Sequence, residues 1–85
     1  MKKICYYDKK NLIAARLKQC REARSITQSD LAAKLQTMNV NMDQQMISKI
    51  EKNKRQVTDY ELACLCKCLG TTPNDLLGFF EWQEE

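Results

Sequence analysis

Four short signals for the start of a helix divide this 85-residue chain and limit its fold more than any other feature. Two of them are capping boxes, TQSD (27–30) and TDYE (58–61), in which the first and fourth side chains can each bond to a backbone amide of the first turn. Asp43 is a third N-cap residue. The segment TPND (72–75) combines an N-cap, a proline at the first helical position and an acid at the third. Together with a helical pattern after Asn11, these signals predict an all-α domain of five short helices.

Each predicted helix has an apolar face. The first helix should run from Asn11, its N-cap, to about Arg24, the second over about 28–36 and the third over about 44–52. Gly70 is expected to end the fourth helix as a C-cap glycine, and Gly78 to stop the fifth. The inward-facing residues at helical spacing are Ile13, Leu17, Cys20, Leu31, Ala32, Leu35, Met46, Ile47, Ile50, Leu62, Leu65, Cys66, Leu69, Leu76 and Leu77.

Charge is distributed unevenly along the chain. The net charge is only +3, but residues 1–56 carry thirteen Lys and Arg against five Asp and Glu, whereas residues 57–85 carry one Lys against six acids. A basic front half of this kind indicates a polyanionic partner. No apolar run reaches the roughly 20 residues of a membrane span, and the first ten residues lack the apolar core of a signal peptide. We therefore expect a cytoplasmic protein that does not interact with membranes.

Five cysteines and no histidine limit the possible chemistry. Ser-His and Cys-His catalysis are excluded, and no glycine-rich phosphate loop is present, so we expect neither an enzyme nor a cofactor. Cys64, Cys66 and Cys68 form a CxCxC run, but on a helix Cys66 points away from the other two, so the three thiols cannot converge on one metal ion. We interpret them as small buried thiols, with a thiol or metal sensor as the alternative.

The segment DQQMISKIE (43–51), followed by the basic run KNKR (52–55), predicts an unusual helix surface. Gln45, Ser48, Lys49 and Lys52 lie opposite its apolar side, with Gln44 at the edge. A glutamine amide can donate one hydrogen bond and accept another at the same time. Recognition of a base edge in the major groove requires this combination. Considered alone, the same pattern also fits an ordinary solvated helix face.

The order of these segments resembles the helix-turn-helix domain of the Cro/CI-type (lambda-repressor-like, XRE family) regulators. Three blocks carry the resemblance: SITQSDLAAKL (25–35), QQMISKIEKNKR (44–55) and ELACLCKCLGTTPNDLLG (61–78). The resemblance covers residues 13–78, about three quarters of the chain. It implies a five-helix lambda-repressor-like fold in which helices two and three form the helix-turn-helix and helix three is the recognition helix.

The resemblance also implies roles for individual residues. The implied base contacts are Gln44, Gln45, Ser48 and Lys49. The implied phosphate contacts are Gln28, Lys52, Asn53, Lys54 and Arg55. Glu51 matches an acid that pairs, partly buried, with an arginine late in helix one, here Arg21, and Gln28 matches a residue that also braces the recognition helix.

One departure from the family pattern lies between helices two and three. From Leu31 to Ser48 this chain has about five more residues than the family usually has, and the short turn normally marked by glycine is replaced by QTMNVNM (36–42). Either helix two is longer or the connection is a true loop. Its polar residues are either solvated or make extra phosphate contacts; they are Thr37, Asn39 and Asn41.

These observations predict a sequence-specific DNA-binding transcriptional regulator, a repressor, with an N-terminal arm (1–10), a helix-turn-helix domain (11–78) and an aromatic, acidic tail (79–85). We expect a homodimer on double-stranded DNA, because one domain reads only a few base pairs. Its contact would involve Phe79, Phe80 and Trp82, alone or together with Ile4, Tyr6 and Tyr7; the alternative is that these aromatics fold back on the core. The alternative is a protein-interaction module, such as an antitoxin or small adaptor, that uses the acidic, aromatic C-terminal half.

Overall fold

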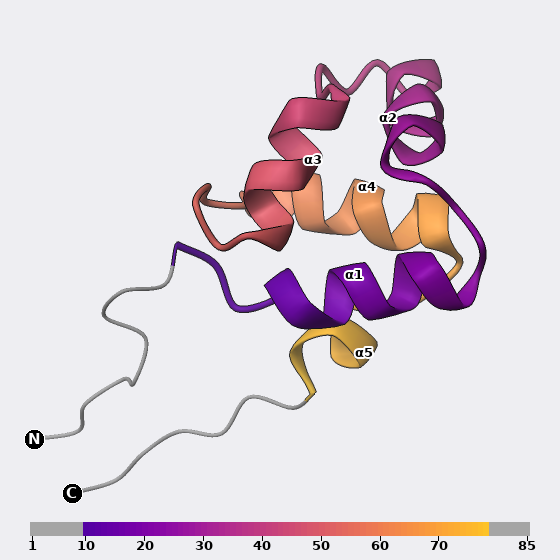
Figure 1. Cartoon of the computed structure of the whole chain (residues 1–85). Coiled ribbons are helices and arrows are strands. Elements are labelled where there is room, and N and C mark those ends of the chain that lie inside the picture. Colours follow the sequence, from indigo (N-terminus) through magenta and orange to yellow (C-terminus); the bar gives the residue numbers. More distant parts are fainter. Residues whose placement is uncertain (1–9, 79–85) are drawn as a thin grey trace, which may run out of the picture.

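The computed structural model describes residues 10–78, and in this part of the chain every regular element is an α-helix (Figure 1). The five helices are α1 (Ala14–Ala23), α2 (Gln28–Thr37), α3 (Gln44–Glu51), α4 (Asp59–Leu69) and α5 (Pro73–Leu77). The predicted all-α fold with five short helices is confirmed. Within the same residues, no helix is both long and apolar enough to cross a membrane. The N-terminal arm before Lys10 and the tail after Gly78 lie outside the described residues.

Four of the five helices begin where local sequence predicted. The hydroxyls of Thr27, Thr58 and Thr72 each accept from the backbone amide three residues later, and each of these capping boxes is closed by the acid at that position. The Asp43 carboxylate accepts from the amide of Met46 at 2.8 Å. These bonds form within one turn, so they depend little on the rest of the fold.

The start of α1 differs from the prediction. The helix begins three residues after Asn11, with Ile13 as an N-cap whose side chain makes no capping hydrogen bond. The Asn11 Oδ1 accepts from the amide of Ile13 at 3.0 Å. The same side chain also bonds across the molecule, because its Nδ2 donates to the carbonyls of Ile50 (3.1 Å) and Arg55 (2.9 Å). Asn11 therefore joins the beginning of α1 to the end of α3.

Four helices end in a turn that requires a left-handed residue. Ser25, Asn39, Asn53 and Gly70 have φ of 56°, 63°, 62° and 67°. After each helix, two amides bond back to carbonyls of the last turn in the Schellman pattern, as in the bonds from Asn39 N to Gln36 O and from Val40 N to Leu35 O, both 3.0 Å. Only Gly70 was predicted; the other three ends use serine or asparagine where glycine is usual.

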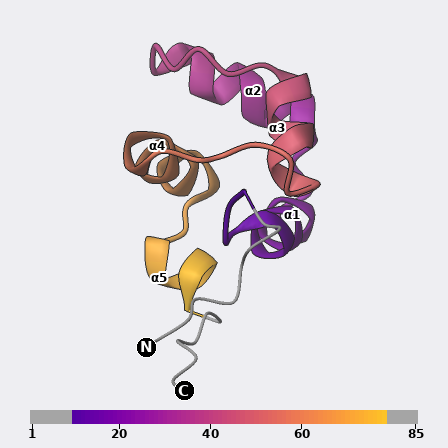
Figure 2. The ribbon, with the colours of Figure 1, turned by 90° about the vertical axis from the view of Figure 1, so that its left-hand side faces the viewer.

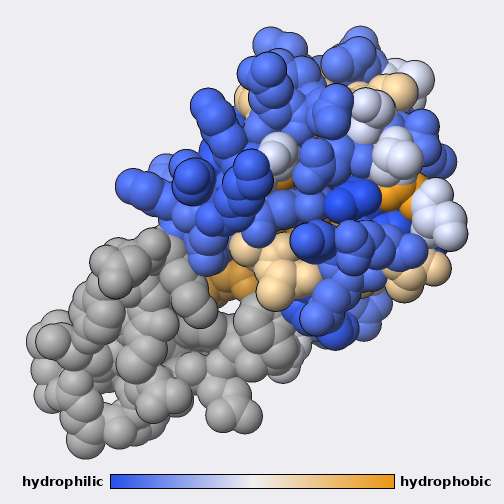
Figure 3. Space-filling view, in the orientation of Figure 1, coloured by the Kyte–Doolittle hydropathy of each residue, from blue (hydrophilic) through white to orange (hydrophobic). Residues whose placement is uncertain are grey.

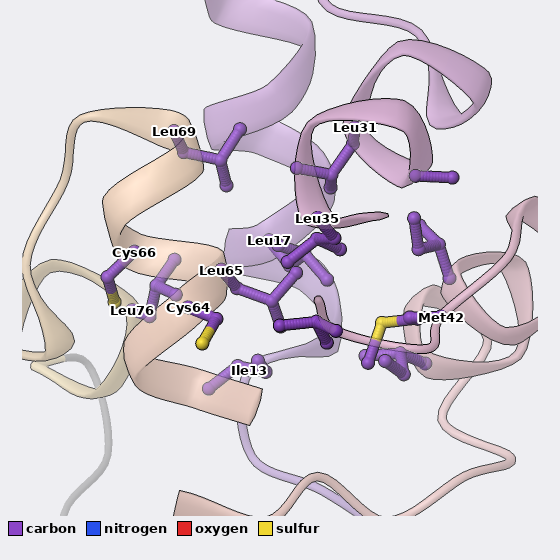
Figure 4. Packing of buried hydrophobic residues seen from close by; sticks show 14 residues of the cluster. Ile13, Leu17, Leu31, Leu35, Met42, Cys64, Leu65, Cys66, Leu69 and Leu76 are labelled. Atoms are coloured by element: carbon purple, nitrogen blue, oxygen red, sulfur yellow. The ribbon is translucent and has the colours of Figure 1, made fainter. Parts of the chain in front are cut away.

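The helices pack around one apolar core. α2 contacts both α3 and α4, α1 contacts α3 and α5, and α4 contacts α5. Figures 1 and 2 show α2 across one end of the molecule, with α3 leading from it to α1. The buried apolar residues, many of them shown in Figure 4, are Ile13, Leu17, Leu31, Ala32, Leu35, Val40, Met42, Ile47, Ile50, Cys64, Leu65, Cys66, Leu69 and Leu76.

The connection between α2 and α3 is a true loop, from Met38 to Asp43, after a helix that reaches Thr37. Its residues alternate between core and solvent: Val40 and Met42 are buried, whereas Asn39 and Asn41 are exposed. Because Met42 immediately precedes the N-cap of α3, this anchoring fixes where the helix starts. The extra residues therefore do not loosen the geometry around α3.

Candidate DNA-binding surface

The outward side of α3 is polar. Gln44, Gln45 and Lys49 are exposed and Ser48 is half-buried, while Ile47 and Ile50 point into the core. Hydrophilic side chains cover the side of the molecule where α3 and its following loop lie (Figure 3). A shallow hollow in this surface is lined by Gln45, Ser48, Lys49, Lys52 and Lys54. Amide, hydroxyl and ammonium groups, which can bond to bases and phosphates, therefore meet on one exposed face.

Gln44 is oriented by a residue that the sequence reasoning did not single out. The Ser29 hydroxyl, at the start of α2, donates to Gln44 Oε1 at 2.9 Å. With its carbonyl oxygen engaged in this way, the amide turns its two N–H donors away from Ser29. The contact joins the first turns of the two helices, and the position of Ser29 one residue after Gln28 was the available clue.

Behind the exposed face, Arg21 and Glu51 form a bidentate pair. Arg21 Nε lies 2.7 Å from Glu51 Oε2 and Arg21 Nη2 lies 3.1 Å from Glu51 Oε1. Their side chains are only 10% and 4% exposed. The hydrogen bond to Glu51 is the main cause that raises the pKa of the Arg21 guanidinium, so this guanidinium is charged at neutral pH.

Two further bonds extend this pair to both helices of the helix-turn-helix. Gln28 Nε2 donates to Glu51 Oε1 at 3.0 Å, and Arg21 Nη1 donates to the carbonyl of Ile26 at 2.8 Å. The end of α1, the start of α2 and the end of α3 thus share one carboxylate. Gln28, expected to brace α3 and hold a phosphate, is half-buried and contacts α3 through this bond.

The four residues after α3 divide into two kinds. Lys52 and Lys54 are exposed. Asn53 Oδ1 accepts from the amides of Lys10 (2.8 Å) and Asn11 (3.0 Å). The guanidinium of Arg55 is bonded to the carboxylate of Glu61 in α4. The four residues expected to grip phosphates therefore include two whose polar groups already have partners within the chain.

The cysteines of α4 behave as packing residues. Cys64 and Cys66 are buried, and Cys68 is half-buried with its Sγ 3.4 Å from Met38 Sδ. Burial raises the pKa of the Cys66 and Cys68 thiols above the usual range, which keeps them protonated and weakly nucleophilic. Over residues 10–78 no three His, Cys, Asp or Glu side chains come close enough together to hold a metal ion.

Comparisons with known proteins place this architecture in a family. No curated protein sequence matches the chain. The crystal structure of the restriction-modification controller protein C.AhdI from Aeromonas hydrophila is similar in fold, with 23% sequence identity, a TM-score of 0.67 and coverage of 75% of this chain and 86% of that chain. The family model for the helix-turn-helix, HTH_3, matches residues 17–76. The chain belongs to this HTH_3 family of Cro/CI-type, DNA-binding transcription regulators.

Proposed function

We propose that this protein is a sequence-specific repressor that reads the major groove with α3. The observation that carries the proposal is the outward set of Gln44, Gln45 and Lys49, which are exposed, with the half-buried Ser48, on a helix braced from behind by the Arg21–Glu51 pair. Glutamine amides discriminate between base edges, and a rigid helix holds them at a fixed depth. Lys52 and Lys54 follow on the same face and supply charge for the phosphate backbone.

We further propose that the functional unit is a homodimer. A single α3 spans only a few base pairs, so useful specificity requires two domains on half-sites about 34 Å apart. Phe79, Phe80 and Trp82 are the proposed dimer contact, and they lie outside the described residues. Repression would follow from occupation of a site that a polymerase also needs.

Selection of bound sequences from a random duplex pool tests the proposal. The wild-type chain is expected to enrich a palindromic consensus. The double variant Gln44→Ala/Gln45→Ala should lose base preference at the positions read by these side chains, since each good amide contact contributes about 1–3 kcal/mol of discrimination. Gln19→Ala is the matched control, because Gln19 is an exposed glutamine on α1 whose amide oxygen bonds to Arg16 on the side that contacts α5.

Two results would contradict the proposal. An unchanged consensus from the double variant would show that α3 does not read the site. A wild-type chain that enriches no consensus at all would favour the protein-interaction module, whose partner would then bind the acidic C-terminal half.

Ser29→Ala should broaden base preference without abolishing binding. The substitution removes the donor to Gln44 Oε1, so the Gln44 amide can rotate and present its oxygen as well as its N–H groups. We expect a two- to fivefold loss of discrimination at one symmetric position of the consensus, about 0.4–1 kcal/mol, which is the usual contribution of one neutral hydrogen bond. Ser29→Thr keeps the hydroxyl and should keep the wild-type preference. Equal profiles for the alanine and wild-type chains would refute this orienting role.

A further inference from the structure

The loop after α3 is fixed at its first end by two asparagines. The loop joins Glu51 of α3 to Asp59 of α4. Asn11 Nδ2 bonds to the carbonyls of both Ile50 and Arg55, at 3.1 and 2.9 Å, and so ties the last turn of α3 to the middle of the loop. Asn53 has a left-handed backbone conformation, with φ of 62°, and its Oδ1 accepts a hydrogen bond from the amide of Asn11 at 3.0 Å. These bonds leave the backbone of the loop little freedom.

The second end is fixed by an ion pair with α4. Arg55 Nη1 lies 2.9 Å from Glu61 Oε1, and Arg55 Nη2 lies 3.0 Å from Glu61 Oε2. Arg55 Nη1 also donates to the carbonyl of Gln56 at 2.9 Å. The two side chains are 24% and 16% exposed, well covered for surface charges. Both terminal nitrogens of the guanidinium are thus engaged, with the fork-to-fork geometry that carboxylates favour.

Glu61 serves two structural purposes through one carboxylate. Its Oε1 also accepts from the amide of Thr58 at 3.1 Å, which completes the capping box of α4. The hydrogen bond from Arg55 is the main cause that lowers the pKa of the Glu61 carboxyl, and the bond from the Thr58 amide lowers it further. The carboxylate is therefore ionised at neutral pH and neutralises the guanidinium beside it.

We infer that Glu61 is a positioning residue which holds Arg55 away from the DNA backbone and, through Arg55, fixes the loop that carries Lys52 and Lys54. This inference rests on the proposed DNA-binding function. It changes the assignment of Arg55 from a phosphate contact to a residue that holds the loop in position against α4. The phosphate contacts are then made by the two exposed lysines, Lys52 and Lys54. Neither of them makes an ion pair with a carboxylate of residues 10–78.

The dependence of DNA affinity on salt separates these roles. Each phosphate neutralised by a side chain contributes about −0.9 to the slope of log K against log salt concentration. The probe is a short duplex of arbitrary sequence, and the full chain is used throughout. Lys54→Gln should make the slope shallower by about 0.9. Arg55→Gln should leave the slope unchanged, because a guanidinium already paired with a carboxylate releases no counterion.

Glu61→Gln is the sharpest variant. Glutamine at this position retains the capping box, so α4 keeps its start, but the charge that holds Arg55 is removed. The freed guanidinium should steepen the slope by up to about 0.9. In the double variant Arg55→Gln/Glu61→Gln the slope should return to that of the wild type. A thermal unfolding curve for each variant shows that the comparison is made on folded protein.

Each result decides the inference. If Arg55→Gln makes the slope shallower, as Lys54→Gln is expected to do, the inference is overturned, because Arg55 would then be a phosphate contact. An unchanged slope in Glu61→Gln, or an equally steep slope in the double variant, would overturn the assignment of Glu61 as the group that restrains Arg55. If the wild-type chain shows no salt-dependent DNA affinity, the proposed function itself fails, and this outcome is distinct from the other three.

Discussion

Replacing Glu51 with alanine will lower the free energy of unfolding by about 3–5 kcal/mol, because the change leaves the guanidinium of Arg21 buried without its carboxylate. Arg21 is 8% exposed, and its Nε and Nη2 both bond to Glu51. A domain of this size has a total stability on the order of 4–13 kcal/mol. The expected loss is therefore a large fraction of the whole, and it should lower the midpoint of thermal unfolding by roughly 15–30 °C. Urea unfolding followed by far-ultraviolet circular dichroism measures it.

The double variant Arg21→Met/Glu51→Leu separates the cost of breaking the pair from the value of the pair. Removing both charges leaves no buried unpaired ion, and replacement by apolar groups of similar size is often neutral or stabilising. We expect the double variant to regain most of the stability lost in Glu51→Ala. Glu22→Ala, on the exposed side of α1, is the control and should change stability by less than about 0.5 kcal/mol. A loss below about 1 kcal/mol in Glu51→Ala would mean that water reaches Arg21 when the carboxylate is absent.

The helix starts were predictable from sequence because their causes are local. Thr27, Asp43, Thr58 and Thr72 each satisfy amides within one turn of their own position. The order of those starts then limits the chain to one small helical domain. The ion pair of Arg21 with Glu51 spans thirty residues, and its prediction came from the resemblance to a family.

The features that sequence did not predict depend on distant partners. Asn11 is an acceptable N-cap by type, and its Oδ1 does accept from a nearby amide, that of Ile13, but its Nδ2 bonds to two carbonyls about forty residues away, and α1 starts at Ala14. Arg55 follows Lys52, Asn53 and Lys54, and this basic run predicts a phosphate contact. In the structure, the Arg55 side chain bonds to Glu61. In each case the prediction considered only the residues next to the side chain in sequence, whereas its partner in the fold is distant in sequence or lies on another helix.

The end of α2 was predicted to within one residue, at about 36 against the observed Thr37, but the left-handed turn that ends it was not predicted. Without glycine, the segment QTMNVNM gives no standard stop signal, yet Asn39 adopts the left-handed conformation that glycine usually provides. The alternation of apolar and polar residues from Met38 to Met42 was visible in the sequence, and it predicts a chain with one side on the core. We find that side buried at Val40 and Met42.

Met42→Ala should therefore cost about 2–5 kcal/mol in the free energy of unfolding, although its position in a loop would suggest a small effect. The Met42 side chain is fully buried beside the first turn of α3, and its removal leaves a cavity between the connection and the core. We also expect weaker DNA binding than the loss of folded protein alone would cause, because Met42 immediately precedes Asp43, the residue that caps α3. Denaturant unfolding gives the first quantity, and DNA titration at a temperature where the variant is fully folded gives the second.

Asn41→Ala is the matched control for this prediction. It is the neighbouring residue of the same loop, and its side chain is exposed, so its removal should change stability by less than about 0.5 kcal/mol. If Met42→Ala and Asn41→Ala are equally mild, the connection is a tolerant solvated loop and the placement of α3 depends on the Arg21–Glu51 pair alone. If only Met42→Ala is severe, the longer connection is part of the core. α3 is then held from both ends, by Met42 before its first turn and by Glu51 in its last.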